Sequence, residues 1–311
     1  MAKRRSRKTR QTRFRSFVTL ALIVIIGLLS VILHRNGDQG GIDGRTESGV
    51  YDLQVHYIDV GQADSILIRI PTENGMKNML IDAGTSSGYP AKVITDYLDG
   101  LGVETISYMI VTHPHFDHNA AAQRVIENYR VEKLILPECD TSQKTWLNML
   151  EAMEELGLGY IPSKMGDTYQ IGDASFEILG PVDASKVKEN DANNWSVVIR
   201  LDYGETSFLF TGDAEEKSEK AMLAAQPSSK FKCDVLKLGH HGSETSTSEA
   251  FLAAADPSLA IIPCGEGNDY GHPEQVILDR LKKASVPVLR TDLEGTIIIC
   301  SDRKEVYRLT K

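Results

Sequence analysis

The sequence predicts an α/β domain preceded by one N-terminal transmembrane helix. An uncharged apolar run lies near the start of the chain, and the rest contains segments with the two-residue period of strands and the 3.6-residue period of helices. A histidine-rich loop lies where one predicted strand meets a helix. This mixture of elements is typical of α/β proteins, in which helices cover the outer faces of the sheets.

The N-terminal segment predicts a membrane anchor. Residues 1–16 carry eight Lys and Arg residues and no acidic residue, and the 17 residues that follow, 17–33, are uncharged and apolar. A span needs about 17 to 25 such residues, so we predict a transmembrane helix over residues 17–34. A cleaved signal peptide is the alternative, but its apolar core is usually about 7 to 15 residues long and is followed by an Ala-x-Ala-like site, which is absent here. The positive-inside rule places the N-terminal tail in the cytoplasm and the later residues outside the cell membrane, as a single-pass protein.

The remaining chain is predicted to be a linker and one acidic domain. Residues 35–49 are glycine-rich without apolar periodicity, which predicts a flexible linker. Residues 50–311 are enough for a single α/β domain. Removing the eight N-terminal positive charges from the formal net charge of −9 leaves −17 for the rest. Because non-specific binding of nucleic acid depends on Lys and Arg, any such substrate must be captured locally, by metals and a few side chains.

The expected elements begin with an antiparallel meander of three strands and continue as strands alternating with helices. Gly172-Asp173 and Gly204-Glu205 each predict the turn of a hairpin. Pro273 is expected in the first turn of the last helix. The predicted strands are 52–59, 65–70, 78–82, 106–111, 131–136, 168–180 (a hairpin), 195–203, 207–211, 234–238, 259–263, 296–300 and 305–309, and the predicted helices are 90–101, 119–129, 142–156, 214–225, 247–255 and 273–284.

The loop Thr-His-Pro-His-Phe-Asp-His predicts a metal site. His113 and His115 are two apart on an extended segment, so they project to the same side and can bind one cation, while Phe116 projects elsewhere. Asp117 and His118 lie where the chain turns into a helix and can reach a second cation, about 3.5 to 4 Å from the first in two-metal sites. These ligand types suit zinc, manganese or iron. A solvated polar loop is the weaker alternative, because three of the eight histidines fall within six positions.

This loop resembles the His-x-His-x-Asp-His signature of the metallo-β-lactamase superfamily. Further stretches strengthen the resemblance: the Gly-Asp that ends at Asp213, the pair His240-His241, the segment Asp-Val-Gly-Gln before Ala63, and Tyr-Gly-His-Pro around His272. As a set they resemble the hydrolase domain of ComEC-type DNA-uptake proteins over about residues 50–311. The resemblance implies a four-layer αββα sandwich with the site at the edges of the sheets.

The resemblance also implies roles for single residues. Asp213 would bridge both metals; taken alone, it could equally be a helix-capping aspartate. Neighbouring residues on a strand point to opposite sides, so only one of His240 and His241 is expected to be a ligand, and the resemblance favours His240. His241 would then hold a phosphoryl oxygen or donate a proton. Asp82 is expected to orient metal-ligating side chains.

One ligand of the superfamily is missing from this sequence. A further histidine usually lies between the first motif and Gly-Asp, but no histidine occurs between Asn119 and Asp213. Asn-Asn-Trp-Ser stands there instead, and we expect Asn194 either to serve as a substitute ligand or to orient a ligand. An oxygen donor would favour manganese or weaken the first site. We therefore expect up to two divalent ions, zinc or manganese.

The predicted function is that of a membrane-anchored, extracytoplasmic metallohydrolase acting on a phosphodiester, in the manner of a nuclease. A metal-bound hydroxide would attack phosphorus. Asp117 would position it and accept its proton, and His241 or His272 would assist the leaving oxygen; a capping role before the last helix is the alternative for His272. The same superfamily includes lactam, lactone and thioester hydrolases. A non-catalytic accessory module of DNA uptake is the alternative from another class.

Overall fold

The computed structural model describes residues 44–45, 47, 49, 52–86 and 89–310. The predicted tail, residues 1–16, and the predicted anchor, residues 17–34, lie outside this part of the chain. Among the described residues, none of the helices combines the length and the apolar character that crossing a bilayer requires.

The end of the predicted linker is part of a sheet. Strand β1 (Gly44–Arg45) pairs in parallel with β18 (Val306–Leu309). The guanidinium of Arg45 lies 3.9 Å from the centre of the Tyr307 ring and also forms an ion pair with Glu305. The prediction that residues 35–49 are all linker is therefore wrong at this end, because pairing and ring stacking hold the strand on the sheet.

Nine strands of the described chain form the first sheet, in the spatial order β1, β18, β17 (Ile297–Ser301), β2 (Leu53–Tyr57), β3 (Ile66–Thr72), β4 (Gly75–Ile81), β6 (Tyr108–Ile110), β8 (Leu134–Leu136) and β9 (Ile161–Pro162). The predicted antiparallel meander is confirmed as β2, β3 and β4, and the hairpin between β3 and β4 closes with the pair Thr72 and Gly75. From β4 onwards the pairs β4–β6, β6–β8 and β8–β9 are parallel.

Seven described strands form the second sheet, in the order β10 (Thr168–Ile171), β11 (Ala174–Gly180), β12 (Val198–Tyr203), β13 (Thr206–Phe210), β14 (Val235–Lys237), β15 (Leu259–Ile262) and β16 (Val288–Arg290). Both predicted hairpins are confirmed, with Gly172 and Gly204 at the positive φ that tight hairpin turns require. Strands β13 to β16 are parallel, so the ends of β13 and β14 lie at the same edge.

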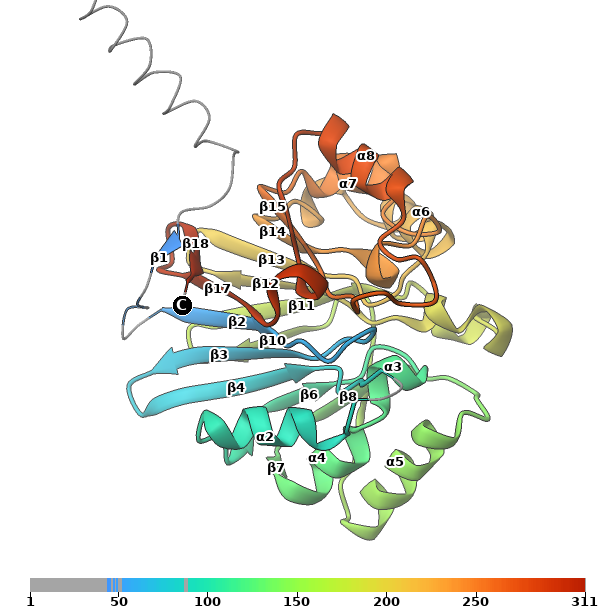
Figure 1. The fold of residues 1–311 in the computed structure, drawn as a ribbon. Coiled ribbons are helices and arrows are strands. Elements are labelled where there is room, and N and C mark those ends of the chain that lie inside the picture. The colour runs from blue at the N-terminus through green and yellow to red at the C-terminus, as the bar shows by residue number, and fades with distance from the viewer. Residues whose placement is uncertain (1–43, 46, 48, 50–51, 87–88, 311) are drawn as a thin grey trace, which may run out of the picture. The chain divides into compact units, whose positions relative to one another are not determined.

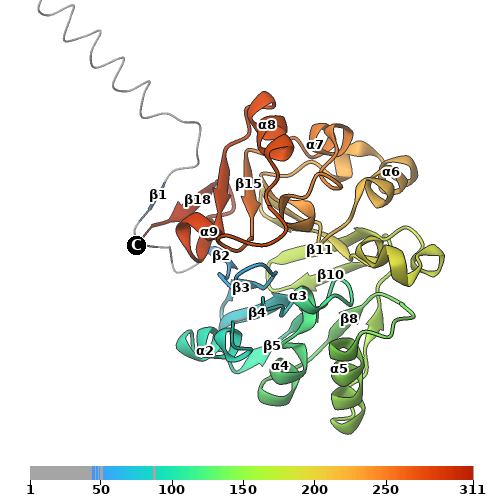
Figure 2. The same cartoon turned by 45° about the vertical axis from the view of Figure 1, so that its right-hand side comes forward.

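Helices cover the outer face of each sheet, as Figures 1 and 2 show. One apolar cluster joins the first sheet to its helices and another joins the second sheet to its helices. The four-layer αββα sandwich is confirmed. On the first sheet lie α2 (Lys92–Gly100), α4 (Ala122–Asn128) and α5 (Lys144–Glu155), and on the second lie α6 (Glu216–Ala225), α7 (Glu249–Ala255) and α8 (Gln275–Lys283).

Several predicted elements differ from the observed ones for local reasons, and the predicted strand 131–136 is among them, divided into β7 (Arg130–Val131) and β8. The predicted strand 106–111 is divided, because β5 (Thr105–Ile106) pairs with β7 in a separate small sheet. The predicted helix 119–129 is divided into α3 (Phe116–Asn119) and α4, and between them the amide of Ala121 donates to the carbonyl of Ala83. Helix α8 begins after Pro273 rather than containing it, since the amide of Glu274 bonds the Gly242 carbonyl.

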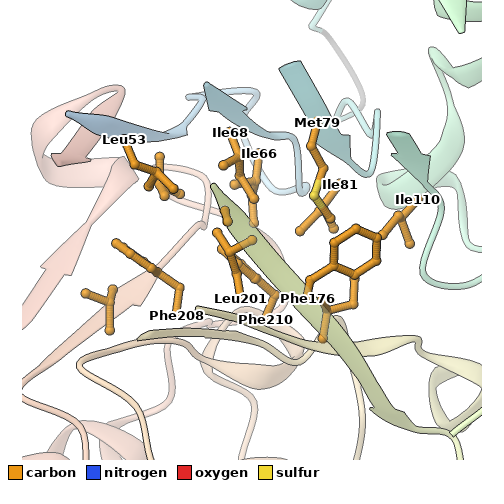
Figure 3. Packing of buried hydrophobic residues seen from close by; sticks show 14 of the residues in the cluster. Leu53, Ile66, Ile68, Met79, Ile81, Ile110, Phe176, Leu201, Phe208 and Phe210 are labelled. Carbon is orange, nitrogen blue, oxygen red and sulfur yellow. The ribbon is translucent and has the colours of Figure 1, made fainter. Parts of the chain in front are cut away.

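The main core lies between the two sheets. Figure 3 shows Leu53, Ile68 and Ile81 of the first sheet facing Phe176 and Phe210 of the second. Burial of such a side chain contributes roughly 1.5 to 3 kcal/mol. This packing fixes the distance between the sheets and therefore between the loops at their edges.

We predict that Phe176→Ala destabilises the fold by about 3 to 5 kcal/mol, because it leaves a cavity between the sheets. The Phe176 ring is 1% exposed and lies 5.0 Å, centre to centre, from the rings of Tyr108 and Tyr169. Urea unfolding in the presence of a chelator measures the change. Leu293→Ala is the control, since Leu293 is exposed and should change stability by less than about 0.5 kcal/mol. Equal effects of the two substitutions would contradict this account of the core.

Candidate metal centre

The histidine-rich loop follows β6 and is fixed at its start by Asp82. The amide and hydroxyl of Thr112 donate to the two carboxylate oxygens of Asp82, at 2.7 and 2.8 Å. Asp82 itself has a positive φ of 59°, a conformation that costs a non-glycine residue about 1 to 2 kcal/mol. At Gly84 an added Cβ would lie 1.5 Å from the carbonyl oxygen of Asp117. The loop therefore packs against backbone that only glycine can provide.

Four side chains converge beside this loop. The ligand-capable atoms of Asp117, His118, Asp213 and His241 all lie within 4.8 Å of one another. His118 Nε2 is 3.2 Å from Asp213 Oδ2, and His241 Nε2 is 3.3 Å from Asp117 Oδ2 and 3.6 Å from Asp213 Oδ2. We call these four residues the inner group.

In the inner group each imidazole presents Nε2 to the carboxylates, and a hydrogen bond from its Nδ1 orients the ring. His118 Nδ1 donates to Asp82 at 2.7 Å, and His241 Nδ1 donates to the carbonyl of Pro263 at 2.9 Å. Each Nε2 is buried and has no hydrogen-bond partner, only the nearby carboxylate oxygens. A carboxylate or carbonyl behind the ring is the usual arrangement for a metal-ligating histidine. The residues therefore fit a divalent ion, and Asp82 lies where the sequence predicts it.

A second pair of imidazoles lies beside the inner group, with the His113 ring 4.1 Å, centre to centre, from that of His118. His113 Nε2 and His115 Nδ1 are 3.1 Å apart, so the two rings converge as the spacing of the motif predicts. Asp213 Oδ2 is 4.0 Å from His113 Nε2. Burial and the neighbouring charge of His118 lower the pKa of His113 well below its usual value, so its ring is neutral and can bind a cation. Asp213 Oδ2 thus lies near histidines of both groups, as a carboxylate shared by two cations would.

The histidine pair differs from its prediction. After β14 the chain enters a short 3-10 turn, η4 (Gly239–Gly242), in which His240 and His241 both have left-handed backbone angles, with φ of 50° and 52°. The prediction assumed an extended backbone at this point. Here His241 belongs to the inner group, whereas His240 Nε2 lies 3.8 Å from Asp213 Oδ2 and outside that group. The geometry therefore favours His241 as the metal ligand and leaves His240 for contact with the substrate.

Asn194 does not lie where a substitute ligand would. Its amide nitrogen donates to the Glu215 carboxylate at 3.1 Å, and its oxygen accepts the Glu215 amide at 3.3 Å. Ser196 is closer to the ligand groups, since its hydroxyl accepts the amide of Asp213 and lies 3.3 Å from His113 Nδ1. The neighbouring Asn193 has a buried side-chain oxygen without a hydrogen-bond partner. Both polar groups of Asn194 are thus engaged by Glu215, whereas the side-chain oxygen of Asn193 is free to bind a cation, so the geometry favours Asn193 as the substitute ligand.

A buried lysine was missed. Lys237 is completely buried, forms an ion pair with Asp64, donates to the carbonyl of Gly212 at 2.7 Å and lies 3.6 Å from Asp213 Oδ1. Burial alone would lower its pKa, but the charges of Asp64 and Asp213 raise it, so the lysine stays protonated. A lysine between apolar residues of a predicted buried strand was the available signal, because such a charge must be paired.

Charges around the inner group are arranged in pairs. Burial opposes charge on His241, but the carboxylates of Asp213 and Asp64 raise its pKa to about 10. Burial would also raise the pKa of Asp213, yet the nearby charges of His118, His241 and His240 hold it well below its usual value. The carboxylate is therefore ionised at neutral pH, and a bound cation would take the place of protons on the imidazoles.

A cavity of about 340 Å³ opens over the inner group. Its lining includes His115, Asp117, His240 and His272. The rings of His240 and His272 lie 5.4 Å apart, centre to centre. His272, predicted to contact substrate, thus lies at the cavity rather than only before helix α8.

Comparisons with known proteins agree with this geometry. Residues 58–266 match the family described as the metallo-beta-lactamase superfamily. The chain is 34% identical to ComE operon protein 3 of Bacillus subtilis over 78% of its length, and 32% identical to Recombination protein 2 of Haemophilus influenzae over 82%. It covers 32% and 30% of those relatives, so it spans about a third of their length.

The fold is also found among solved structures. The metallo-beta-lactamase fold protein YhfI of Bacillus subtilis superposes with a TM-score of 0.52 at 12% identity, over 80% of this chain and 100% of that one. Sequence, fold and the convergent histidine and aspartate side chains lead to one conclusion. The chain belongs to the metallo-beta-lactamase superfamily and has its fold.

Proposed function

We propose that this protein is a metal-dependent phosphodiesterase with up to two divalent ions. The observation that carries the proposal is the position of Asp213 Oδ2, which lies 3.2 Å from His118 Nε2 and 4.0 Å from His113 Nε2, beside an open cavity. Ions held there would act as Lewis acids and lower the pKa of water. The inner group would hold one ion, and His113 and His115 the other, with Asn193 offering an oxygen.

The residues over the inner group suit a phosphate. Gln62 accepts the Gly265 amide with its oxygen, so its NH₂ faces His272 Nδ1, at 3.5 Å. This contact favours the tautomer of His272 with the proton on Nε2, which can donate to a leaving oxygen. Burial, and after it the charges of His240 and His241, lower the pKa of His272, so the neutral ring would donate a hydrogen bond rather than a proton. His240 would hold a non-bridging oxygen.

The relatives and the N-terminal sequence support the biological setting. The names competence protein and recombination protein belong to proteins that match this chain, and they suit a nucleic-acid substrate. The basic residues and the uncharged run at the start of the sequence support an extracytoplasmic domain anchored in the cell membrane. The acidic composition requires that the phosphate be captured at the metal centre rather than by the surface.

We predict that His241→Ala weakens metal binding by at least about tenfold, because it removes an imidazole aimed at the inner group. His240→Ala is the matched control and should leave metal content nearly unchanged while reducing turnover. Metal content after dialysis, measured by mass spectrometry, distinguishes the two variants. If His240→Ala loses metal and His241→Ala retains it, His240 is the ligand, as the resemblance implied, and our assignment of His241 is wrong.

Lys237→Met is predicted to destabilise the protein by about 3 to 5 kcal/mol, because it removes the ion-pair partner of the buried Asp64 carboxylate. The double variant Lys237→Met with Asp64→Asn should recover part of this loss, since the amide carries no charge. Urea unfolding of the single and double variants in chelator gives the coupling energy. If the double variant is no more stable than Lys237→Met, the pairing of the two charges does not hold the centre together.

The reaction class is tested by offering the protein, supplied with manganese or zinc, a phosphodiester, a phosphomonoester, a lactam, a lactone and a thioester. We predict turnover of the diester, and a loss of at least about 10²-fold on Asp213→Ala, which removes the shared carboxylate. Circular dichroism of the variant controls for folding. Turnover of acyl substrates without the diester would refute the phosphodiesterase and favour a lactam, lactone or thioester hydrolase. Metal binding without any turnover would favour an accessory module of DNA uptake.

A further inference from the structure

Three exposed aromatic side chains surround a cleft beside the metal centre. Tyr89, Phe116 and Tyr270 are 42%, 49% and 72% exposed, and all three line a cleft of about 520 Å³. Gln62 and Asp117 also line it, and both of them line the cavity over the inner group as well. Phe116 and Tyr270 also line both the cleft and the cavity, so the cleft opens directly onto the candidate metal centre.

This gathering of aromatic rings is unusual for a surface exposed to water. Single exposed apolar side chains are ordinary, but a group of them beside a site indicates a ligand surface. In the described part of the chain, Tyr160 is the other exposed aromatic side chain, and it lies at a different cavity. Tyr270 is held in place by stacking on His272, with ring centres 5.7 Å apart and planes at 25°.

The motif itself directs Phe116 into the cleft. His115 and Asp117 turn towards the metal centre, so the residue between them faces outward and remains exposed. Phe116 is also the first residue of helix α3, which is anchored by the bonds of the loop to Ala83 and Asp64. The ring therefore lies beside the candidate metal centre at a fixed position.

The negative charges of the cleft disfavour the binding of several phosphates within it. Its acidic lining residues are Asp117, Glu266 and Asp269, and none of the described lining residues is Lys or Arg. The charge of Asp59 and, less strongly, partial burial and Glu266 raise the pKa of Tyr89, which is the effect of a negative field. A flat uncharged group is accepted by such a surface, whereas each further phosphate beyond it is repelled.

We propose that this cleft binds the unpaired base of a terminal nucleotide, stacked against Phe116 and Tyr270, so that the one phosphodiester joining this nucleotide to the strand lies over the metal centre. The proposal rests on the proposed function and names its substrate as a single-stranded end. Hydrolysis adds water across one P–O bond: phosphorus gains the hydroxyl oxygen, and the leaving oxygen gains the proton. A terminal mononucleotide is released.

The binding step is tested with short single-stranded oligonucleotides that carry 2-aminopurine at the 5′ end, at the 3′ end or in the middle. The full-length protein is supplied with Ca²⁺ so that binding is measured without turnover. Stacking on an aromatic ring should quench the fluorescence of a terminal probe and leave the internal probe bright. Quenching at neither end, or equal quenching in the middle, overturns the proposal.

Variants separate stacking from a general effect on the protein. Phe116→Ala and Tyr270→Ala should each weaken binding of the terminal probe by about tenfold, the size expected for loss of one base–aromatic stack. Tyr160→Ala removes an equally exposed ring outside the cleft and should change nothing. Equal weakening by Tyr160→Ala would overturn the proposal.

Hydrolysis distinguishes failure of this inference from failure of the proposed function. The wild-type protein with manganese should cleave a base-bearing terminus about tenfold better than a terminus whose last nucleotide is abasic, and Phe116→Ala should abolish that difference. Equal cleavage of both substrates by the wild type would refute the cleft while the phosphodiesterase stands. Quenching without cleavage of either substrate would refute the phosphodiesterase while base binding stands.

Discussion

The ion pair between Lys237 and Asp64 is the interaction on which the candidate metal centre depends. Asp64, Asp82 and Asp213 are all buried, and burying carboxylates is unfavourable unless each is paired. Lys237 contacts two of the three, and His118 lies between Asp82 and Asp213. The lysine places a permanent positive charge at the end of β14. The acidic groups that a divalent ion requires can therefore be held in a folded chain before an ion binds.

The two sheets bring these groups to one edge. Asp82 follows β4 and the histidine loop follows β6, which is parallel to it, while Asp213 follows β13 and His241 follows the parallel strand β14. The carboxyl ends of parallel strands lie at the same edge of a sheet. The first sheet therefore positions Asp82 and the histidine loop, and the second sheet positions Asp213 and His241. The core between the sheets then sets the distance between the halves. Core packing and metal affinity are coupled for this reason.

The parts of the site that could be predicted from the sequence are those that depend on local geometry. The histidine loop holds its ligands within a few consecutive residues, and alternation along an extended backbone is enough to explain the convergence of His113 and His115. The same rule failed at His240 and His241 because both residues have left-handed backbone angles, which only tertiary contacts stabilise. The bond of Asn194 to Glu215 and the pairing of Lys237 with Asp64 join distant segments, so no spacing in the sequence indicates them.

The charge of the protein and the chemistry of its cleft have a common explanation. An acidic protein meets an anionic polymer with repulsion at every phosphate except the one that bound cations neutralise. Recognition must therefore come from groups whose attraction does not depend on charge, and aromatic rings provide it. The metal motif supplies one such ring itself, because Phe116 is turned outward by the inward orientation of its two neighbours. If the proposed function holds, seven consecutive residues would place the ions and one wall of the cleft in fixed relation to each other, and hydrolysis would be restricted to the phosphate next to a stacked base.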